Sequence, residues 1–155
     1  CLCTHAGVAG IWARRYLPEH PDAKRDAESV ARELNGMLAD SANWEALDSC
    51  PPSRGGWSLP GPLWADLRDL AADPLAGIPQ IVGHTPVPAA ANVSKMTSRP
   101  DMPDIWACDT MSLTSGGVPF GDGTMLIADE EGNVEPIPFP GGDYAEIALR
   151  YWLNR

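Results

Sequence analysis

Short apolar runs along the chain predict strands that are buried on at least one face. Three runs of this kind are Cys1–Thr4, Ile78–Val82 and Ile105–Cys108. Two further segments, Thr124–Ala128 and Val134–Ile137, are separated by a polar stretch with Gly132-Asn133 in the expected turn. That arrangement predicts a β-hairpin near the end of the chain.

Other segments have apolar residues at helical spacing. One helix is expected to begin near Asp26 and to place Val30, Leu34, Met37 and Leu38 on one face. The further helical segments are Asn43–Leu47, which is one short turn, Leu63–Leu70, which ends before Ala72-Asp73-Pro74, and Tyr144–Leu153, which is expected to pack on the sheet. The segment Cys50–Pro62 is rich in Pro, Gly and Ser and predicts a long loop. Together these patterns predict an α/β fold.

Length and composition limit the class of protein. The 155 residues correspond to one domain, and 44% hydrophobic with 21% charged residues is typical of a globular chain. Eleven basic against 21 acidic residues give a net charge of -10, which disfavours nucleic-acid binding. The sequence has no apolar run long enough for a membrane span and no signal-peptide pattern, so a cytoplasmic location is expected.

The four cysteines, at positions 1, 3, 50 and 108, do not form the paired Cys-x-x-Cys clusters of closed zinc sites. We expect them to be free structural thiols. Cys1 and Cys3 alternate along a predicted strand, where free cysteines are usually buried.

Polar residues follow the predicted strands at three places. These are Thr4-His5-Ala6-Gly7, Gly83-His84-Thr85-Pro86 and Asp109-Thr110. In α/β sheets, ligands gather beyond the carboxyl ends of strands, and neutral imidazole is a common ligand of transition metals. For either histidine taken alone, a structural hydrogen bond explains its position as well as metal binding does. His20 has no such context and is expected at the surface.

These motifs, in this order, resemble those of the calcineurin-like metallophosphoesterases, and in particular the branch of bacterial and phage phosphoprotein phosphatases and bis-tetraphosphatases. The resemblance rests on Leu2–Val8, Ile78–Val87 and Ile105–Thr110 with Gly116-Gly117. It implies a four-layer α/β sandwich, with a mixed sheet and flanking helices, in which 1–155 is the carboxy-terminal portion of a single domain. It also implies two divalent metals, with Mn²⁺ favoured over Fe or Zn, and His5 and His84 as ligands of the same ion.

The resemblance implies roles for two further residues. Arg54 lies in the interval where the family carries a phosphate-binding arginine, and a guanidinium can donate two parallel hydrogen bonds to phosphate oxygens. A solvated loop arginine is the alternative. Asp109 matches the Asp of the family's Asp-Thr-Gly motif and would orient groups around the metals, although Met111 stands in place of the glycine.

The amino-terminal half of the family's metal centre has no counterpart in the sequence. Asp-x-His, Gly-Asp-x-x-Asp-Arg-Gly and Gly-Asn-His-Glu are all absent, and the chain starts within a predicted strand. We therefore expect a phosphoesterase half whose partner is the amino-terminal half, as a separate chain or a removed segment, with a phosphate ester as substrate. Without its complement, the chain is expected to expose apolar sheet surface and to form homo-oligomers or aggregates.

Two alternatives stay open. The chain can be a non-catalytic binding or structural module derived from this fold. It can also be a one-metal enzyme of another kind that uses His5, His84 and Asp109, which would need good geometry from three protein ligands.

Overall fold

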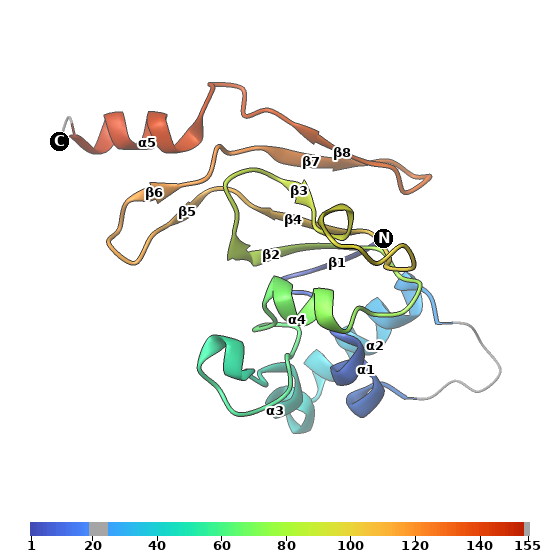
Figure 1. Cartoon of the computed structure of the whole chain (residues 1–155). Coiled ribbons are helices and arrows are strands. Elements are labelled where there is room, and N and C mark those ends of the chain that lie inside the picture. Colours follow the sequence, from blue (N-terminus) through green and yellow to red (C-terminus); the bar gives the residue numbers. More distant parts are fainter. Residues whose placement is uncertain (19–24, 154–155) are drawn as a thin grey trace.

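A four-stranded mixed sheet forms the centre of the fold (Figure 1). The computed structural model describes residues 1–18 and 25–153, without the side chains of 151–153. The strand order is β1-β2-β4-β3, where β1 (Leu2–Thr4), β2 (Gln80–Pro86) and β4 (Ile105–Asp109) are parallel and β3 (Ala91–Asn92) runs antiparallel to β4. The expected α/β class with a mixed sheet is confirmed.

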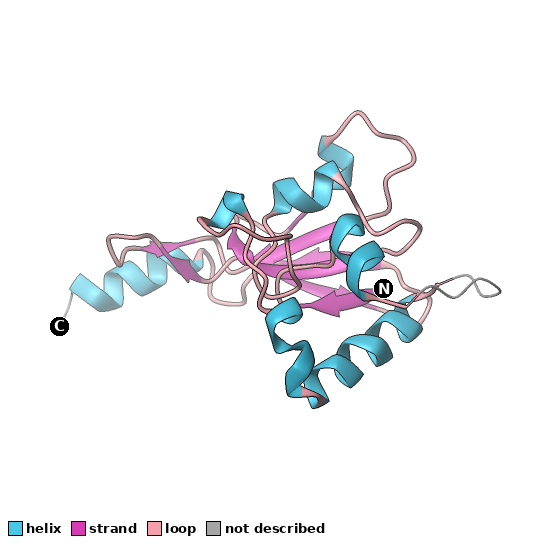
Figure 2. Ribbon diagram, turned by 90° about the horizontal axis from the view of Figure 1, so that it is seen from below, coloured by secondary structure: helices cyan, strands magenta, loops and turns pink. Residues whose placement is uncertain are grey.

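Four helices lie on one side of this sheet (Figures 1 and 2). They are α1 (Gly10–Tyr16), α2 (Ala27–Ala39), α3 (Trp44–Leu47) and α4 (Leu67–Ala72). Asp26 caps α2 by accepting a hydrogen bond from Ser29 N at 2.8 Å, and Asp66 caps α4 in the same way through Arg68 N at 3.0 Å. Short 3-10 turns occur at Ser41–Asn43, Pro52–Arg54 and Ser94–Met96.

The core lies between the helices and this face of the sheet. One cluster, around the fully buried Trp12 and Val30, joins α1 and α2 to the start of β1. A second cluster, around Leu70, Val82 and Ile105, packs α4 on the middle of the sheet. Because strand residues alternate between faces, Leu2, Val82 and Ile105 are buried here while their strand neighbours point to the other side.

Two small hairpins and the last helix follow β4. The hairpins pair β5 (Ser112–Leu113) with β6 (Pro119–Phe120), and β7 (Met125–Ala128) with β8 (Val134–Ile137). In Figure 1, β7 and β8 lie on the opposite side of the sheet from α1–α4. A cavity of about 510 Å³ separates β7 from the sheet and is lined by Cys3, Ile81 and Cys108 among others. The second face of the sheet is therefore only loosely covered.

Some expectations from the sequence are wrong in detail. The segment Gly10–Tyr16 forms a helix that the pattern did not predict. The predicted helix Leu63–Leu70 begins only at Leu67 because Trp64 and Ala65 are held in a turn by Gly61 O and Asp66 caps the helix. The final helix α5 (Tyr144–Leu153) has the predicted bounds but contacts β6 rather than packing across the central sheet.

The expected burial of Cys1 and Cys3 is also wrong. Both are exposed, while Cys50 and Cys108 are half-buried, and all four thiols are free. The reason is that β1 is an edge strand and Cys3 lies on the loosely covered face. His20 lies outside the described residues. In the described part of the chain, no helix has both the length and the apolar character needed to cross a membrane.

Candidate functional site

The three strand ends singled out in the sequence meet at one edge of the sheet. Thr4 of β1 pairs with Val82 of β2, which in turn pairs with Ala107 of β4. His5 and His84 thus come one and two residues after paired positions. Gly83 N donates a hydrogen bond to His5 O at 2.9 Å, which extends the contact between the two strands past Thr4.

The two histidine rings contact each other. His5 Nε2 and His84 Nδ1 are 3.0 Å apart, and the ring centroids are separated by 4.8 Å. A hydrogen bond at this distance needs a proton on one of these nitrogens and a lone pair on the other. The backbone of His84 has a φ of 63°, a left-handed conformation that is uncommon for a residue other than glycine. The bulge between Val82 and Pro86 accompanies this conformation and turns the His84 ring toward β1.

The surroundings of His84 favour its neutral form. Burial lowers the pKa of His84, and the positive charges of Arg54 and His5 lower it further, while the carboxylates of Asp109 and Asp66 act in the opposite direction. The Trp64 indole also lies near the ring and perpendicular to it, at 5.5 Å between centroids. A neutral imidazole keeps the lone pair that a metal ion requires.

The separation of the two nitrogens is that of a hydrogen bond, and it also equals the spacing of two adjacent ligands on one ion. Two nitrogens that each lie about 2.1 Å from an ion, at an angle of about 90°, are about 3.0 Å apart, which is the separation of His5 Nε2 and His84 Nδ1. Within residues 1–18 and 25–153, however, no group of three or more His, Cys, Asp or Glu side chains is arranged to hold a metal. Among these residues the two histidines are therefore a pair of nitrogen ligands at most, and not a complete metal site.

Arg54 lies beside the histidine pair. Its Nη2 donates to the hydroxyl of Thr85, the residue after His84, and lies 3.3 Å from Asp66 Oδ2. Its Nε is buried and has no hydrogen-bond partner among the described residues, and the same is true of His84 Nε2. The sequence alone left Arg54 as either a solvated loop residue or a site residue, and the structure places it against the residue that follows His84.

Asp109 is close to the pair without touching it. It ends β4 opposite Pro86, and its carbonyl oxygen accepts a hydrogen bond from Val87 N at 2.9 Å. Its carboxylate raises the pKa of His84 through space, but among the described residues it forms no hydrogen bond with either histidine. Asp109 thus contributes charge to the site rather than a direct contact.

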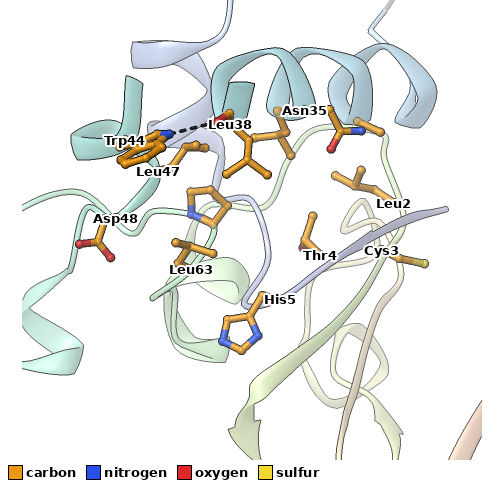
Figure 3. Close-up of a pocket in the computed structure, with 13 residues that line it drawn as sticks. Leu2, Cys3, Thr4, His5, Asn35, Leu38, Trp44, Leu47, Asp48 and Leu63 are labelled. Carbon is orange, nitrogen blue, oxygen red and sulfur yellow. Dashed lines mark hydrogen bonds between the residues drawn. The ribbon is translucent and has the colours of Figure 1, made fainter. Parts of the chain in front are cut away.

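A cavity of about 550 Å³ opens next to His5, between β1, α2 and α3 (Figure 3). Its walls are mainly apolar, and Leu34, Leu38, Trp44 and Leu63 are among the side chains that line it. Figure 3 shows His5 at one end of this cavity and Asn35 near the other. An apolar cavity beside a polar cluster is the usual form of a small-molecule site, and it is also the form of an incompletely covered core.

The sequence assigned no role in this site to three residues: Asp66, Thr85 and Trp64. The carboxylate of Asp66 is only 8% exposed, and Trp64 Nε1 donates to Asp48 Oδ1 at 2.7 Å. The signal for Asp66 was present in Asp66-Leu67-Arg68-Asp69, because Asp three residues before a second acidic residue is typical of a helix N-terminus. That signal indicates a cap and does not reveal which arginine lies next to it.

Searches against protein-family models, curated proteins and solved structures found no match to this chain. The function is therefore argued from the site itself.

Proposed function

We propose that this chain is a phosphoprotein phosphatase-like metallophosphoesterase half. It would contribute half of a dinuclear metal site and hydrolyse phosphate esters when its complement is present. The observation that carries the proposal is the contact of His5 Nε2 with His84 Nδ1 at 3.0 Å, which brings two imidazoles from the ends of neighbouring strands to one place. The resemblance of the strand-end motifs to the calcineurin-like family supports the same assignment, with a fold that is the carboxy-terminal portion of a four-layer sandwich.

Each group of the site has a role in this proposal. His5 and His84 would hold one ion, Mn²⁺ in preference to Fe or Zn, and imidazole binds all three. A pair of divalent ions supplies Lewis-acid stabilisation of the phosphoryl oxygens and a hydroxide at neutral pH. Arg54 would bind phosphate oxygens through guanidinium N–H groups that Thr85 and Asp66 do not use. Asp109 would orient groups around the ions, and its carboxylate acts on His84 through space.

The proposed partner is the amino-terminal half of the phosphoesterase. Two histidines leave a dinuclear centre without its bridging carboxylate, and the described residues offer no group of three ligands. The loosely covered face of the sheet, where Cys3 and Cys108 line a cavity under β7, gives such a complement room to pack. Self-association through the same face is expected when the complement is absent. The free thiols are compatible with a cytoplasmic location, which is part of the proposal.

Hydrolysis of p-nitrophenyl phosphate with Mn²⁺ tests the proposal. The chain is assayed alone and together with a second chain that carries Gly-Asp-x-x-Asp-Arg-Gly and Gly-Asn-His-Glu. We expect hydrolysis only in the mixture, with His5→Asn and His84→Asn each lowering it by more than about tenfold. His20→Asn, which removes the third histidine of the sequence, is the matched control and should leave the rate unchanged. Equal rates for all three variants would contradict the proposal.

A second candidate, a non-catalytic binding or structural module, is favoured by the incomplete ligand set. Calorimetric titration of the chain with Mn²⁺ and Zn²⁺ separates it from the first. A monomer that binds neither ion and stays inactive with the complement is the result expected of such a module. Tight binding of one ion per isolated chain, lost in both His5→Asn and His84→Asn, would instead indicate a one-metal site.

A further inference from the structure

The carboxylate of Asp66 lies between two guanidinium groups. Oδ2 is 3.3 Å from Arg54 Nη2, and Oδ1 accepts hydrogen bonds from Arg68 Nε at 2.9 Å and from Arg68 N at 3.0 Å. The Asp66 side chain is 8% exposed and that of Arg54 is 21% exposed, whereas Arg68 is largely in solvent. The buried pair is therefore Asp66 with Arg54.

Helix α4 fixes the position of Asp66 independently of Arg54. Asp66 is the N-cap of α4, and its side chain accepts a hydrogen bond from the backbone of the first turn. Its own backbone N–H donates to Asp69 Oδ2 at 2.9 Å, so the two residues form a capping box. Burial of the Asp66 carboxyl raises its pKa, but the hydrogen bonds from Arg68 and the charges of Arg54 and Arg68 outweigh that effect and lower the pKa. Asp66 is thus a charged, rigidly held acceptor at neutral pH.

The turn that carries Arg54 is attached to the same cap by a second contact. Ser53 Oγ donates to Asp69 Oδ2 at 2.7 Å, so both carboxylates of the α4 cap hold the Pro52–Arg54 turn. Arg54 Nη2 also donates to Thr85 Oγ1 and thereby connects the cap of α4 to the strand that carries His84. These contacts use Nη2 and leave the buried Nε without a partner in the described part of the chain.

We infer that Asp66 is a positioning residue: it holds the Arg54 guanidinium beside His84 so that the guanidinium N–H groups left over from these contacts can bind a phosphoryl group. The inference rests on the proposed function for the identity of the anion, and its geometric part stands without it. Arginine loses substantial side-chain freedom when it is fixed. A preformed contact with Asp66 means that this freedom is lost during folding and not during substrate binding.

The first experiment measures the order of the Arg54 side chain by ¹⁵N relaxation of its Nε–H group in the metal-free chain, with Arg54→Lys used to assign the signal. Asp66→Asn keeps the helix cap, because Asn caps as well as Asp, and removes the charge that pairs with Arg54. We expect the Nε order parameter to fall from a value typical of a fixed group to below about 0.6. Asp26→Asn, which changes the equivalent cap of α2, should leave it unchanged. An unchanged order parameter in Asp66→Asn overturns the inference.

The second experiment measures binding of inorganic phosphate by calorimetry for the wild type, Asp66→Asn, Arg54→Ala and the double variant. If Asp66 acts through Arg54, Asp66→Asn weakens phosphate binding at least threefold in the wild type and has no further effect once Arg54 is alanine. Equal effects in both backgrounds, or no phosphate binding by the wild type, overturn the role in phosphate binding. Neither experiment uses hydrolysis. A complemented enzyme that fails to hydrolyse the aryl phosphate would therefore refute the proposed function and leave these results interpretable.

Discussion

Gln80 offers a direct test of how the loop after His5 is held in place. It lies in β2 with 0% of its surface exposed, and its carboxamide forms both hydrogen bonds with the backbone of Val8. Gln80 Oε1 accepts from Val8 N at 2.8 Å, and Nε2 donates to Val8 O at 3.0 Å. Val8 is also fully buried, so these backbone groups have no access to water when the carboxamide is removed.

Gln80→Met replaces the carboxamide with an apolar group of similar length. Each buried backbone group that loses its partner costs about 1–3 kcal/mol, so the two groups together predict a loss of about 2–6 kcal/mol in the free energy of unfolding. The change in packing volume is small and contributes less than about 1.5 kcal/mol. A loss in the upper part of this range approaches the whole stability of a typical domain.

Urea unfolding followed by circular dichroism measures the effect, with the free energy taken from the midpoint and the slope. Ile81→Met is the matched control because it changes the neighbouring residue of the same strand, which lies on the loosely covered face and has no side-chain hydrogen bond. We expect it to cost less than about 1.5 kcal/mol. A loss below about 1 kcal/mol in Gln80→Met would show that Val8 finds other partners, and the reasoning would be refuted.

Two further predictions concern the site and its support. In metal-free buffer with chelator, stability should fall as the pH drops from about 7 through the ordinary histidine value of about 6.5. The reason is that burial lowers the pKa of His84, so the unfolded chain binds more protons than the folded chain in that pH range. A series of urea midpoints measured at different pH values checks this. The variant His84→Asn should show a flatter pH dependence, and Asn tolerates the left-handed backbone at this position. Gly7→Ala should lower the thermal midpoint, with a cost of about 1–3 kcal/mol, because Gly7 has a φ of 100° and a Cβ there would lie 2.4 Å from Leu70 Cδ1 in the core. Gly36→Ala, in an open position on α2, should raise the midpoint, and a similar decrease in both variants would argue against the predicted clash.

The order of the elements follows closely from the sequence. The strand runs around Leu2, Val82 and Ile105, the hairpin of β7 and β8, and the bounds of α5 were all predictable because each depends on local periodicity or turn chemistry. The helix α1 was missed because its residues Gly10–Tyr16 mix aromatic, basic and small side chains in too short a segment for a clear period. Its burial of Trp12 and Ala13 depends on the tertiary fold.

The candidate site likewise combines features that the sequence predicted with contacts that only the structure revealed. The sequence by itself identified His5, His84 and Asp109 by their strand-end positions, and the resemblance of the motifs added Arg54 as a candidate. Only the tertiary structure showed that His5 and His84 meet through specific nitrogens and that Asp66 lies against Arg54. These contacts join residues 79 and 12 positions apart in sequence, and they depend on parallel strand register and on the place where α4 begins. No local pattern encodes such distances, since they result from how separately formed elements pack together.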